Sequence, residues 1–329
     1  MKPRAVALLS GGLDSMLAIR IMQDQGIEVE ALNFRTIFTC CKDESAQAAR
    51  DLGVRLTVVG QEDDYLDLIK TPRYGYGRGA NPCVDCRIYM FERAAQFMNQ
   101  VDASFLVSGE VVGQRPMSQK MSDLRLIGRD TRLEDLLLRP LSAKLLPPTL
   151  PERNGLVDRE RLYDFQGRSR KGLIALARQY GFPAIPTPST GCILTERHFG
   201  GKVHDLIEFD PQARRWSFEL LKVGRHFRYD AATKVVLGKD EAQNEMLRQM
   251  GASAEASANV VLEPANFTGP TALVEGAYRE SAARYACGLI LRYTKHTVPD
   301  DAALECRSRG ERWQVPVARD QEAELAETL

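Results

Sequence analysis

The sequence predicts an α/β protein with a doubly wound parallel sheet, followed by a small α+β domain. Up to about residue 180, short apolar runs alternate with segments of helical periodicity, which is the pattern of a parallel sheet with crossover helices. Near residue 205 this alternation stops, and shorter strand-like segments separated by turns follow. Because 329 residues are enough for two domains, we place the first at 1–205 and the second at 206–329.

The elements of the first domain follow from apolar spacing and from residues that stop helices. Ala5–Leu9 is a short apolar run that predicts a buried strand, and Asp14–Gln25 has helical spacing that ends before Gly26. The further strands are expected at Val29–Phe34, Leu56–Val59 and Ser104–Ser108, and the further helices at Glu44–Leu52, Cys86–Asn99 and Gly172–Tyr180. The stretch between the last of these strands and the last helix is expected to be irregular.

The second domain is expected to mix short strands with helices. Its strands are predicted at Phe227–Tyr229, Lys234–Leu237 and Val260–Leu262, and its helices at Glu241–Met250 and Glu280–Tyr293.

Composition narrows the class of protein. The 44 basic and 44 acidic residues cancel, so charged partners must be sought in local clusters. No apolar run approaches the roughly 18 residues of a membrane span, and the apolar run near the N-terminus is too short for a signal peptide. Seven cysteines without a secretion signal argue against a disulfide framework. We therefore expect a cytoplasmic protein that does not act at a membrane; the sequence indicates no oligomeric state.

The segment SGGLDS (residues 10–15) lies between the first strand and the first helix. A helix N-terminus offers unpaired backbone N–H groups and a positive dipole, so it favours an anion. Gly11 and Gly12 allow the backbone to approach that anion closely, and the hydroxyls of Ser10 and Ser15 can donate hydrogen bonds. A bare phosphate would repel Asp14, whose carboxylate is better explained as a ligand of Mg²⁺ bound to phosphates. The segment predicts a phosphate cradle.

Three cysteines lie in two segments that are expected to be loops. ANPCVDCR (80–87) contains Cys83 and Cys86 in C-x-x-C spacing, and TPSTGCILT (187–195) contains Cys192. C-x-x-C alone is compatible with a zinc half-site, a redox or persulfide pair, or iron–sulfur ligands. Three thiolates suit a cluster that keeps one iron without a protein ligand, and that iron could bind sulfide. Cys40 and Cys41, which follow the second strand, are either ordinary thiols or additional sulfur relays.

SGGLDS resembles the pyrophosphate loop (PP-loop) of the ATP pyrophosphatases. Together with VSGEVVGQRPMSQ (107–119) and LLLRPLSAK (136–144), it is similar to the tRNA thiolation branch of that superfamily, most closely the catalytic domain of the 4-thiouridine synthetases. The resemblance covers roughly residues 1–200. It implies a Rossmann-like adenine nucleotide alpha hydrolase fold that binds ATP and Mg²⁺. The nucleotide-binding residues would then be Ser10, Gly11, Gly12, Asp14, Ser15, Asn33, Phe34, Gly109 and Gln114.

The same resemblance implies that Cys83, Cys86 and Cys192 hold a [4Fe–4S] cluster and, with Asp14, are the catalytic residues. Other 4-thiouridine synthetases have an RNA-binding module ahead of the pyrophosphate loop, whereas here the loop begins at residue 10. No rhodanese domain for persulfide delivery is expected either, which agrees with a cluster-based route. The sulfur donor would be inorganic sulfide or a cysteine-desulfurase persulfide.

A basic segment at 210–239 contains seven Lys or Arg and three acidic residues, interleaved with aromatic residues. Basic side chains can neutralise phosphates, and exposed aromatic rings can stack on bases. VGRHFR (223–228) and VLGKDEAQNEML (236–247) are similar to the RNA-binding domain of NFACT-type ribosome quality-control factors. GRSRKG (167–172) adds a second basic cluster. The residues expected to bind RNA are Arg168, Arg170, Lys171, Arg214, Arg215, Arg225 and Arg228.

The resemblance implies an ATP-dependent tRNA sulfurtransferase that adenylates a nucleobase carbonyl, in uridine or cytidine, and replaces its oxygen with sulfur, giving 4-thiouridine in the expected case. Three alternatives remain open. The same chemistry could act on a small metabolite, the cysteines could use a persulfide without a cluster, or the protein could bind nucleotide and RNA without catalysis.

Overall fold

The structure is a computed structural model that describes residues 2–39, 44–60, 62–188, 191–256, 260–308 and 310–329. It divides into two compact units, Met1–Thr195 and Glu196–Leu329. The boundary expected after residue 205 lies inside helix α8, Arg197–Phe209, which belongs entirely to the second unit. Within the described residues, no helix is both long enough and apolar enough to cross a membrane.

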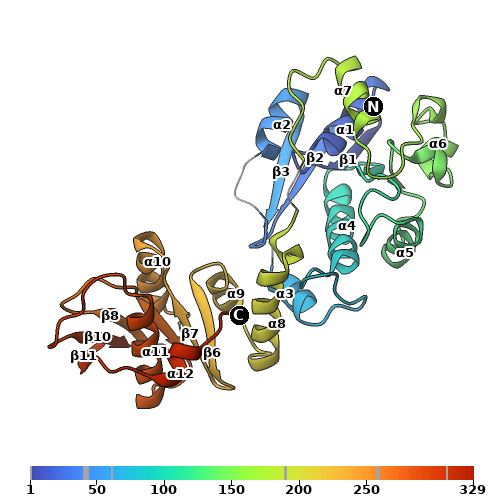
Figure 1. The fold of residues 1–329 in the computed structure, drawn as a ribbon. Coiled ribbons are helices and arrows are strands. Elements are labelled where there is room, and N and C mark those ends of the chain that lie inside the picture. Colours follow the sequence, from blue (N-terminus) through green and yellow to red (C-terminus); the bar gives the residue numbers. More distant parts are fainter. Residues whose placement is uncertain (1, 40–43, 61, 189–190, 257–259, 309) are drawn as a thin grey trace. The chain divides into compact units, whose positions relative to one another are not determined.

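The first unit is built on a five-stranded parallel sheet in the order β3-β2-β1-β4-β5. Figure 1 labels three of these strands, β1, β2 and β3. The chain first builds outward from β1 to β3 and then adds β4 and β5 on the other side of β1. The strand order therefore reverses between β1 and β4, which is where open α/β sheets bind ligands. The strands are β1 Arg4–Leu8, β2 Glu28–Arg35, β3 Arg55–Gly60, β4 Phe105–Val107 and β5 Leu137–Leu138.

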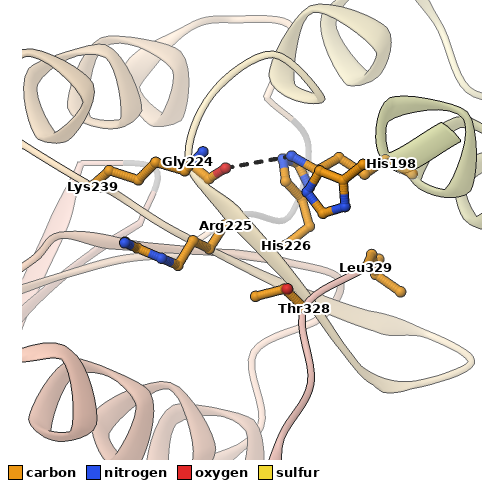
Figure 2. Close-up of a pocket in the computed structure, with 8 residues that line it drawn as sticks. His198, Gly224, Arg225, His226, Lys239, Thr328 and Leu329 are labelled. Carbon is orange, nitrogen blue, oxygen red and sulfur yellow. Dashed lines mark hydrogen bonds between the residues drawn. The ribbon is translucent and has the colours of Figure 1, made fainter. Parts of the chain in front are cut away.

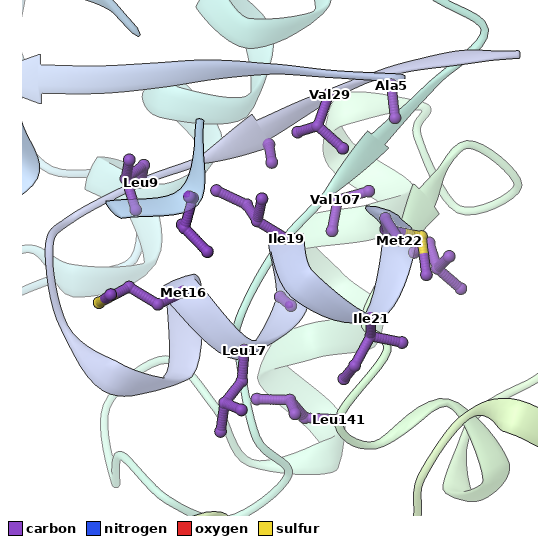
Figure 3. Close-up of a cluster of buried hydrophobic side chains, with 14 of the residues drawn as sticks. Ala5, Leu9, Met16, Leu17, Ile19, Ile21, Met22, Val29, Val107 and Leu141 are labelled. Carbon is purple, nitrogen blue, oxygen red and sulfur yellow. The ribbon is translucent and has the colours of Figure 1, made fainter. Parts of the chain in front are cut away.

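Both faces of this sheet are covered by helices. Successive strand residues point to opposite faces, so Ala5 and Ala7 of β1 pack in one apolar cluster and Val6 packs in another. The first cluster contains α1 and α7, and Figure 3 shows Ile19 of α1 close to Val29 and Val107 of the sheet. The second contains α4 and α5. The doubly wound fold predicted from the sequence is confirmed.

The helices of the first unit are α1 Leu13–Asp24, α2 Glu44–Leu52, α3 Asp63–Lys70, α4 Cys83–Gln100, α5 Met121–Thr131, α6 Leu150–Arg153 and α7 Lys171–Gln179. The expected elements are present, with ends shifted by a few residues. The sequence did not predict α3, α5, α6 or β5. Strand β5 has only two residues, both buried, so it is too short to show an alternating pattern.

The second unit is built on a six-stranded antiparallel sheet in the order β11-β10-β8-β9-β7-β6. Helix α11 packs on one face, where Cys287 and Cys306 are buried in the core, and α9 and α10 pack on the other. The strands are β6 Arg225–Asp230, β7 Thr233–Leu237, β8 Val260–Pro264, β9 Ala272–Glu275, β10 Ala303–Ser308 and β11 Glu311–Pro316. Besides α8, the helices are α9 Arg215–Leu220, α10 Glu241–Ala252, α11 Glu280–Tyr293 and α12 Gln321–Leu325.

His226 of β6 predicts how the stability of the second unit depends on pH. Its side chain is 0% exposed, its Nε2 lies 2.8 Å from the Val223 carbonyl oxygen, and its Nδ1 is buried without a hydrogen-bond partner. Burial is the main cause that lowers the pKa of His226 well below its usual value, and the nearby lysines Lys234 and Lys202 add to this effect. The folded unit therefore keeps this imidazole neutral under conditions in which the unfolded chain binds a proton.

We expect acidification below about pH 6.5 to lower the free energy of unfolding by roughly 1.4 kcal/mol per pH unit through His226 alone. The sign follows because the unfolded state binds more protons than the folded state in this range, and the contribution is fully present above it. Calorimetry of the full chain as a function of pH, compared with His226→Gln, measures the effect. An unchanged pH dependence in the variant would contradict it.

Candidate active site

Four strand ends bring the candidate site residues to one edge of the parallel sheet. Residues 9–12, 108–110 and 139–141 follow the carboxyl ends of β1, β4 and β5, and residues 33–36 include the carboxyl end of β2. Because parallel strands all end at the same edge, segments distant in sequence become neighbours there. The strand order reverses between β1 and β4. SGGLDS follows the first of these strands, and the Ser108–Glu110 segment follows the second.

The SGGLDS segment forms a tight turn into α1. Gly11 has a φ of +82°, which favours glycine, and Gly12 is the N-cap residue of α1. The Ser15 hydroxyl donates to the Gly12 carbonyl oxygen at 2.8 Å, and the Ser10 and Ser15 hydroxyl oxygens lie 3.3 Å apart. The first turn of α1 thus presents backbone N–H groups and two hydroxyls at its N-terminus, as a phosphate cradle requires.

Gly109 lies directly against this turn. A Cβ atom at Gly109 would lie 2.5 Å from the backbone carbon of Asp14 and 2.6 Å from the nitrogen of Ser15. These are backbone atoms, which cannot move aside as the end of a flexible side chain would. Glycine at this position therefore lets the end of β4 contact the N-terminus of α1.

Replacement of Gly109 by alanine is expected to displace the first turn of α1 and to weaken ATP binding by about tenfold or more, because overpacked positions force backbone shifts. Gly60→Ala is the matched control, since a Cβ at Gly60 meets nothing within 4 Å. Isothermal titration with a non-hydrolysable ATP analogue measures the two affinities. Equal affinities for the two variants would argue against this close contact.

Asp14 has an unsatisfied oxygen in this cradle. Its Oδ1 is buried and has no hydrogen-bond partner. Burial raises the pKa of the Asp14 carboxyl above its usual value, and this rise is opposed by a hydrogen bond with Gln114 and by the charges of Arg170 and Arg115. Carboxylate oxygens are preferred ligands of Mg²⁺. The residues present therefore fit Mg²⁺, which Asp14 would hold beside the phosphates.

The two residues expected near adenine have different environments. The side-chain amide of Asn33 donates to the Leu9 carbonyl oxygen at 2.7 Å, so it ties the end of β2 to the end of β1. Phe34 is partly buried and packs against the apolar cluster on the α4 face. Asn33 thus has a clear structural role, and its contact with adenine stays a prediction.

Glu110, which follows Gly109 in the sequence, forms a buried ion pair with Arg139. Glu110 accepts a hydrogen bond from Nε of Arg139 at 3.0 Å, and Arg87 Nε lies 3.4 Å from its other oxygen. Glu110 and Arg139 are 3% and 7% exposed, so this pair is largely shielded from water. The pair joins the ends of β4 and β5 to helix α4. In the described part of the chain, buried atoms without hydrogen-bond partners include Asp14 Oδ1, Glu110 Oε1, Gln119 Oε1 and Arg139 Nη2. Such a group of unsatisfied polar atoms is typical of a ligand site.

The three cysteines lie around one buried tyrosine that the sequence did not single out. The hydroxyl of Tyr65, a residue that is 2% exposed, lies 3.3 Å from the sulfur of Cys86. Burial is the main cause that raises the pKa of Tyr65 well above its usual value, and Cys86, Cys192 and Cys83 all contribute to the rise. The structure thus brings together the cysteines of both loops. Cys40 and Cys41 lie outside the described residues.

The individual thiols have distinct surroundings. The side-chain amide of Asn81 donates to the sulfur of Cys83 at 3.1 Å, and the sulfur of Cys192 lies 3.7 Å from the Phe38 carbonyl oxygen. Burial raises the pKa of Cys86, whereas the Tyr65 hydrogen bond and the charge of Arg87 oppose the rise. No disulfide joins these cysteines, so all three present thiols.

The thiols of Cys83, Cys86 and Cys192 are candidate metal ligands. Within the described residues, no group of three or more His, Cys, Asp or Glu side chains is placed so that it could hold a metal ion. A [4Fe–4S] cluster is held by thiolates that bind different irons, so its cysteines need not converge on one point. Three thiols around Tyr65 fit the donor chemistry of such a cluster.

The charge of Arg115 interacts with groups of both the cradle and the cysteine loops. Burial is the main cause that lowers the pKa of Arg115, and the charge of Arg87 lowers it further, whereas Asp14, Cys83 and Glu110 oppose the shift. Sequence reasoning missed the roles of Arg115, Arg87 and Tyr65. Arg115 follows Gln114 in the motif, and Arg87 follows Cys86, so proximity to recognised residues was the one available signal.

The residues expected to bind RNA divide into two groups. Arg168, Lys171 and Arg214 are exposed, and Arg225 is half-buried. Other members have partners within the protein. Arg170 donates to the Pro186 carbonyl oxygen at 3.0 Å, Arg215 Nη1 lies 3.9 Å from Glu219, and Arg228 Nε donates to Asp205 at 3.0 Å.

The aromatic residues of the basic segment do not offer the stacking surface that the sequence suggested. Trp216, Phe218 and Phe227 are 8%, 0% and 0% exposed and belong to the core of the second unit. Tyr229 is half-buried and packs on Tyr285, with ring centroids 4.7 Å apart. The alternation of basic and aromatic residues thus reflects charged positions next to core positions.

Comparisons with known proteins match each unit separately. Residues 1–144 match the family model of the thiamine biosynthesis protein (ThiI), and residues 224–328 match that of the NFACT protein RNA binding domain. The chain joins a ThiI-type PP-loop domain to an NFACT-type RNA-binding domain. The PP-loop domain contains the cradle and the Cys83 and Cys86 loop.

Curated relatives match part of the chain. The tRNA-specific 2-thiouridylase MnmA of Acidithiobacillus ferrooxidans is 26% identical over 191 residues, which are 55% of this chain and 50% of that protein. The enzyme of the same name from Syntrophotalea carbinolica is 31% identical over 114 residues, 31% of this chain and 32% of that protein. The chain thus spans half or less of the length of these relatives.

Two solved structures are also similar. A 4-thiouridine synthetase–RNA complex with bound ATP is 22% identical and matches 54% of this chain and 50% of that chain, with a TM-score of 0.36. A predicted subunit of tRNA methyltransferase from Methanocaldococcus jannaschii is 14% identical and matches 54% of this chain and 76% of that chain, also with a TM-score of 0.36.

Proposed function

We propose that this protein is an ATP-dependent tRNA sulfurtransferase, which adenylates a uridine carbonyl and replaces its oxygen with sulfur. The observation that most supports this function is the position of Arg115, which lies within electrostatic range of both Asp14 and Cys83. Nucleotide chemistry and thiol chemistry would therefore take place in one site. The resemblance of the SGGLDS, 107–119 and 136–144 segments to the 4-thiouridine synthetases favours 4-thiouridine as the product. The reaction would occur in the cytoplasm, where thiols stay reduced.

In the first step, the uridine carbonyl oxygen attacks the α-phosphorus of ATP. A C–O–P bond forms, the bond between the α-phosphorus and the bridging oxygen breaks, and pyrophosphate leaves. The backbone N–H groups at the start of α1 and the hydroxyls of Ser10 and Ser15 would bind the leaving phosphates. Arg115 and Arg170, whose charges act on Asp14, would offset the negative charge that develops. Asp14 would hold Mg²⁺ on the phosphates.

In the second step, a sulfide nucleophile attacks the same base carbon, and AMP leaves with the original oxygen. No electron transfer is needed, because hydrosulfide supplies the sulfur and releases one proton. Cys83, Cys86 and Cys192 would hold a [4Fe–4S] cluster, which supplies an iron site that binds sulfide when the cluster is present. Tyr65 would orient the Cys86 sulfur through its hydroxyl. The donor of the sulfide is inorganic sulfide in its simplest form, and a persulfide carrier is the alternative.

A pyrophosphate-release assay tests the first step independently of the sulfur chemistry. We expect the full chain with ATP and Mg²⁺ to release pyrophosphate and AMP in amounts that depend on added tRNA. Pyrophosphate release at the same rate with and without tRNA would contradict the proposal. Cleavage of ATP to ADP and phosphate would contradict it as well. Release that depends on a small sulfur-accepting metabolite would move the substrate to that class.

A further inference from the structure

The second unit contains a basic pocket that the proposed chemistry does not use. It has a volume of about 290 Å³ and is lined by residues from α8, from the start of β6, from the segment between β7 and α10 and from the C-terminal segment (Figure 2). Its cations are Lys202, Arg225 and Lys239, and its lining also includes His198 and His226. None of the described residues that line it is Asp or Glu. Leu329, the last residue of the sequence, is also in the lining, so its α-carboxylate must be set against these cations. A concave site in which cations outnumber acids favours an anion.

Lys202 is the most constrained of these cations. It is 6% exposed, and its ammonium donates to the carbonyl oxygens of Leu221 and Gly224, both at 3.4 Å. These hydrogen bonds are long and their acceptors are uncharged carbonyl groups, and no described carboxylate forms an ion pair with Lys202. Burial, together with the charges of Lys239 and Lys234, lowers the pKa of Lys202 to about 8. A buried cation without a counter-ion is costly, and a bound anion would offset that cost.

Lys202 and Lys239 lie within electrostatic range of each other, whereas the guanidinium of Arg225 is turned toward Tyr293. Strands β6 and β7 pair with Arg225 opposite Leu237, so Lys239 lies just beyond the start of β6. Arg225 is held by its guanidinium, which lies 4.7 Å from the ring centre of Tyr293. Helix α8 is fixed to β6 by the ion pair of Asp205 with Arg228, and Lys202 lies one turn before Asp205. The ion pair that occupies Arg228 therefore positions Lys202.

We propose that this pocket binds a phosphate group of RNA. The proposal rests on the RNA-binding role of the second unit and names the contact through which that unit recognises its partner. A phosphate suits the pocket because its oxygens accept hydrogen bonds from several cations at once, whereas the pocket offers few groups that could read a base edge. This contact does not depend on the RNA sequence, and it holds the RNA backbone on the second unit.

Titration of tRNA into the full chain, followed by fluorescence anisotropy at several salt concentrations, tests the pocket. We expect Lys239→Gln and Lys202→Met each to weaken binding by about tenfold and to reduce the slope of log Kd against log salt by about 1, since each removes one phosphate contact. Lys295→Gln is the matched control, because it removes an exposed positive charge from the same unit outside the pocket, and it should change affinity less than about twofold.

The outcomes separate the pocket from the function of the unit. Lys239 is exposed, so its variant tests the pocket without disturbing the core. If the wild-type chain binds tRNA and Lys239→Gln binds it equally well with the same salt slope, the pocket proposal alone is overturned. If the wild-type chain binds no tRNA, the RNA-binding role of the unit fails and the pocket fails with it.

A short RNA prepared with a 5′-phosphate or a 5′-hydroxyl identifies the source of the phosphate. Tighter binding of the phosphorylated form that is lost in Lys239→Gln supports a terminal phosphate. Equal binding of both forms with the same loss in the variant supports an internal phosphodiester.

Discussion

Asp14→Asn is expected to lower the rate of tRNA-dependent pyrophosphate release by roughly 100-fold to 1,000-fold, the range found when one electrostatic stabiliser of a transition state is removed. The substitution preserves the shape of the side chain and its contact with Gln114, but the amide cannot neutralise Mg²⁺ as a carboxylate does. Its buried Oδ1 has no partner within the described protein, so this charge is available for a ligand. The rate should be measured with saturating tRNA and Mg²⁺.

Asp51→Asn provides the matched control for this prediction. Asp51 is exposed in α2 and accepts a hydrogen bond from Gln47 at 2.7 Å, away from the cradle. Its variant should keep the wild-type rate, and both variants should unfold at temperatures close to that of the wild type. A wild-type rate of pyrophosphate release by Asp14→Asn would contradict the assignment of Asp14 as the residue that holds Mg²⁺ on the phosphates.

Cys83→Ser is expected to lower tRNA thiolation by about 100-fold or more while tRNA-dependent pyrophosphate release continues, because a hydroxyl replaces a thiolate as ligand or sulfur carrier. Serine can still accept the hydrogen bond that Asn81 donates to the Cys83 sulfur, so the loop should keep its local contacts. Thiolation should be measured anaerobically with inorganic sulfide as the donor.

The matched control is Cys287→Ala, which removes a thiol buried in the core of the second unit. This variant should retain thiolation, since its thiol lies outside the site of the first unit. Wild-type thiolation by Cys83→Ser would remove Cys83 from the sulfur chemistry. Loss of pyrophosphate release together with thiolation would show instead that Cys83 supports the nucleotide site.

The fold of the first unit could be predicted because its strands and helices have strong apolar periodicity. The helix that follows SGGLDS ends one residue before its expected end, and the helix after β2 matches its expected range, Glu44–Leu52. Strand β5 could not be predicted, because two residues have no period. In the second unit, β10 and β11 contain charged residues at many positions, which conceals their alternation.

The candidate site could be predicted only where a motif marks it. SGGLDS and the cysteines stand out in the sequence, and the structure brings the cysteines of both loops around Tyr65. Tyr65 itself lies in a helix with no motif, and its role depends on contacts between segments far apart in sequence. For the same reason, the basic run at 210–239 could not reveal that Arg228 is paired with Asp205 whereas Arg225 lines a pocket.

The most direct test of the central claim is nucleoside analysis of tRNA after anaerobic incubation with the full chain, ATP, Mg²⁺ and sulfide. The substrate should be tRNA that lacks thiolated bases, and the digested nucleosides should be compared by chromatography and mass spectrometry with 4-thiouridine and 2-thiouridine standards. The account predicts 4-thiouridine that forms only when ATP is present. An active ATP-splitting protein that leaves every nucleoside without sulfur would contradict it.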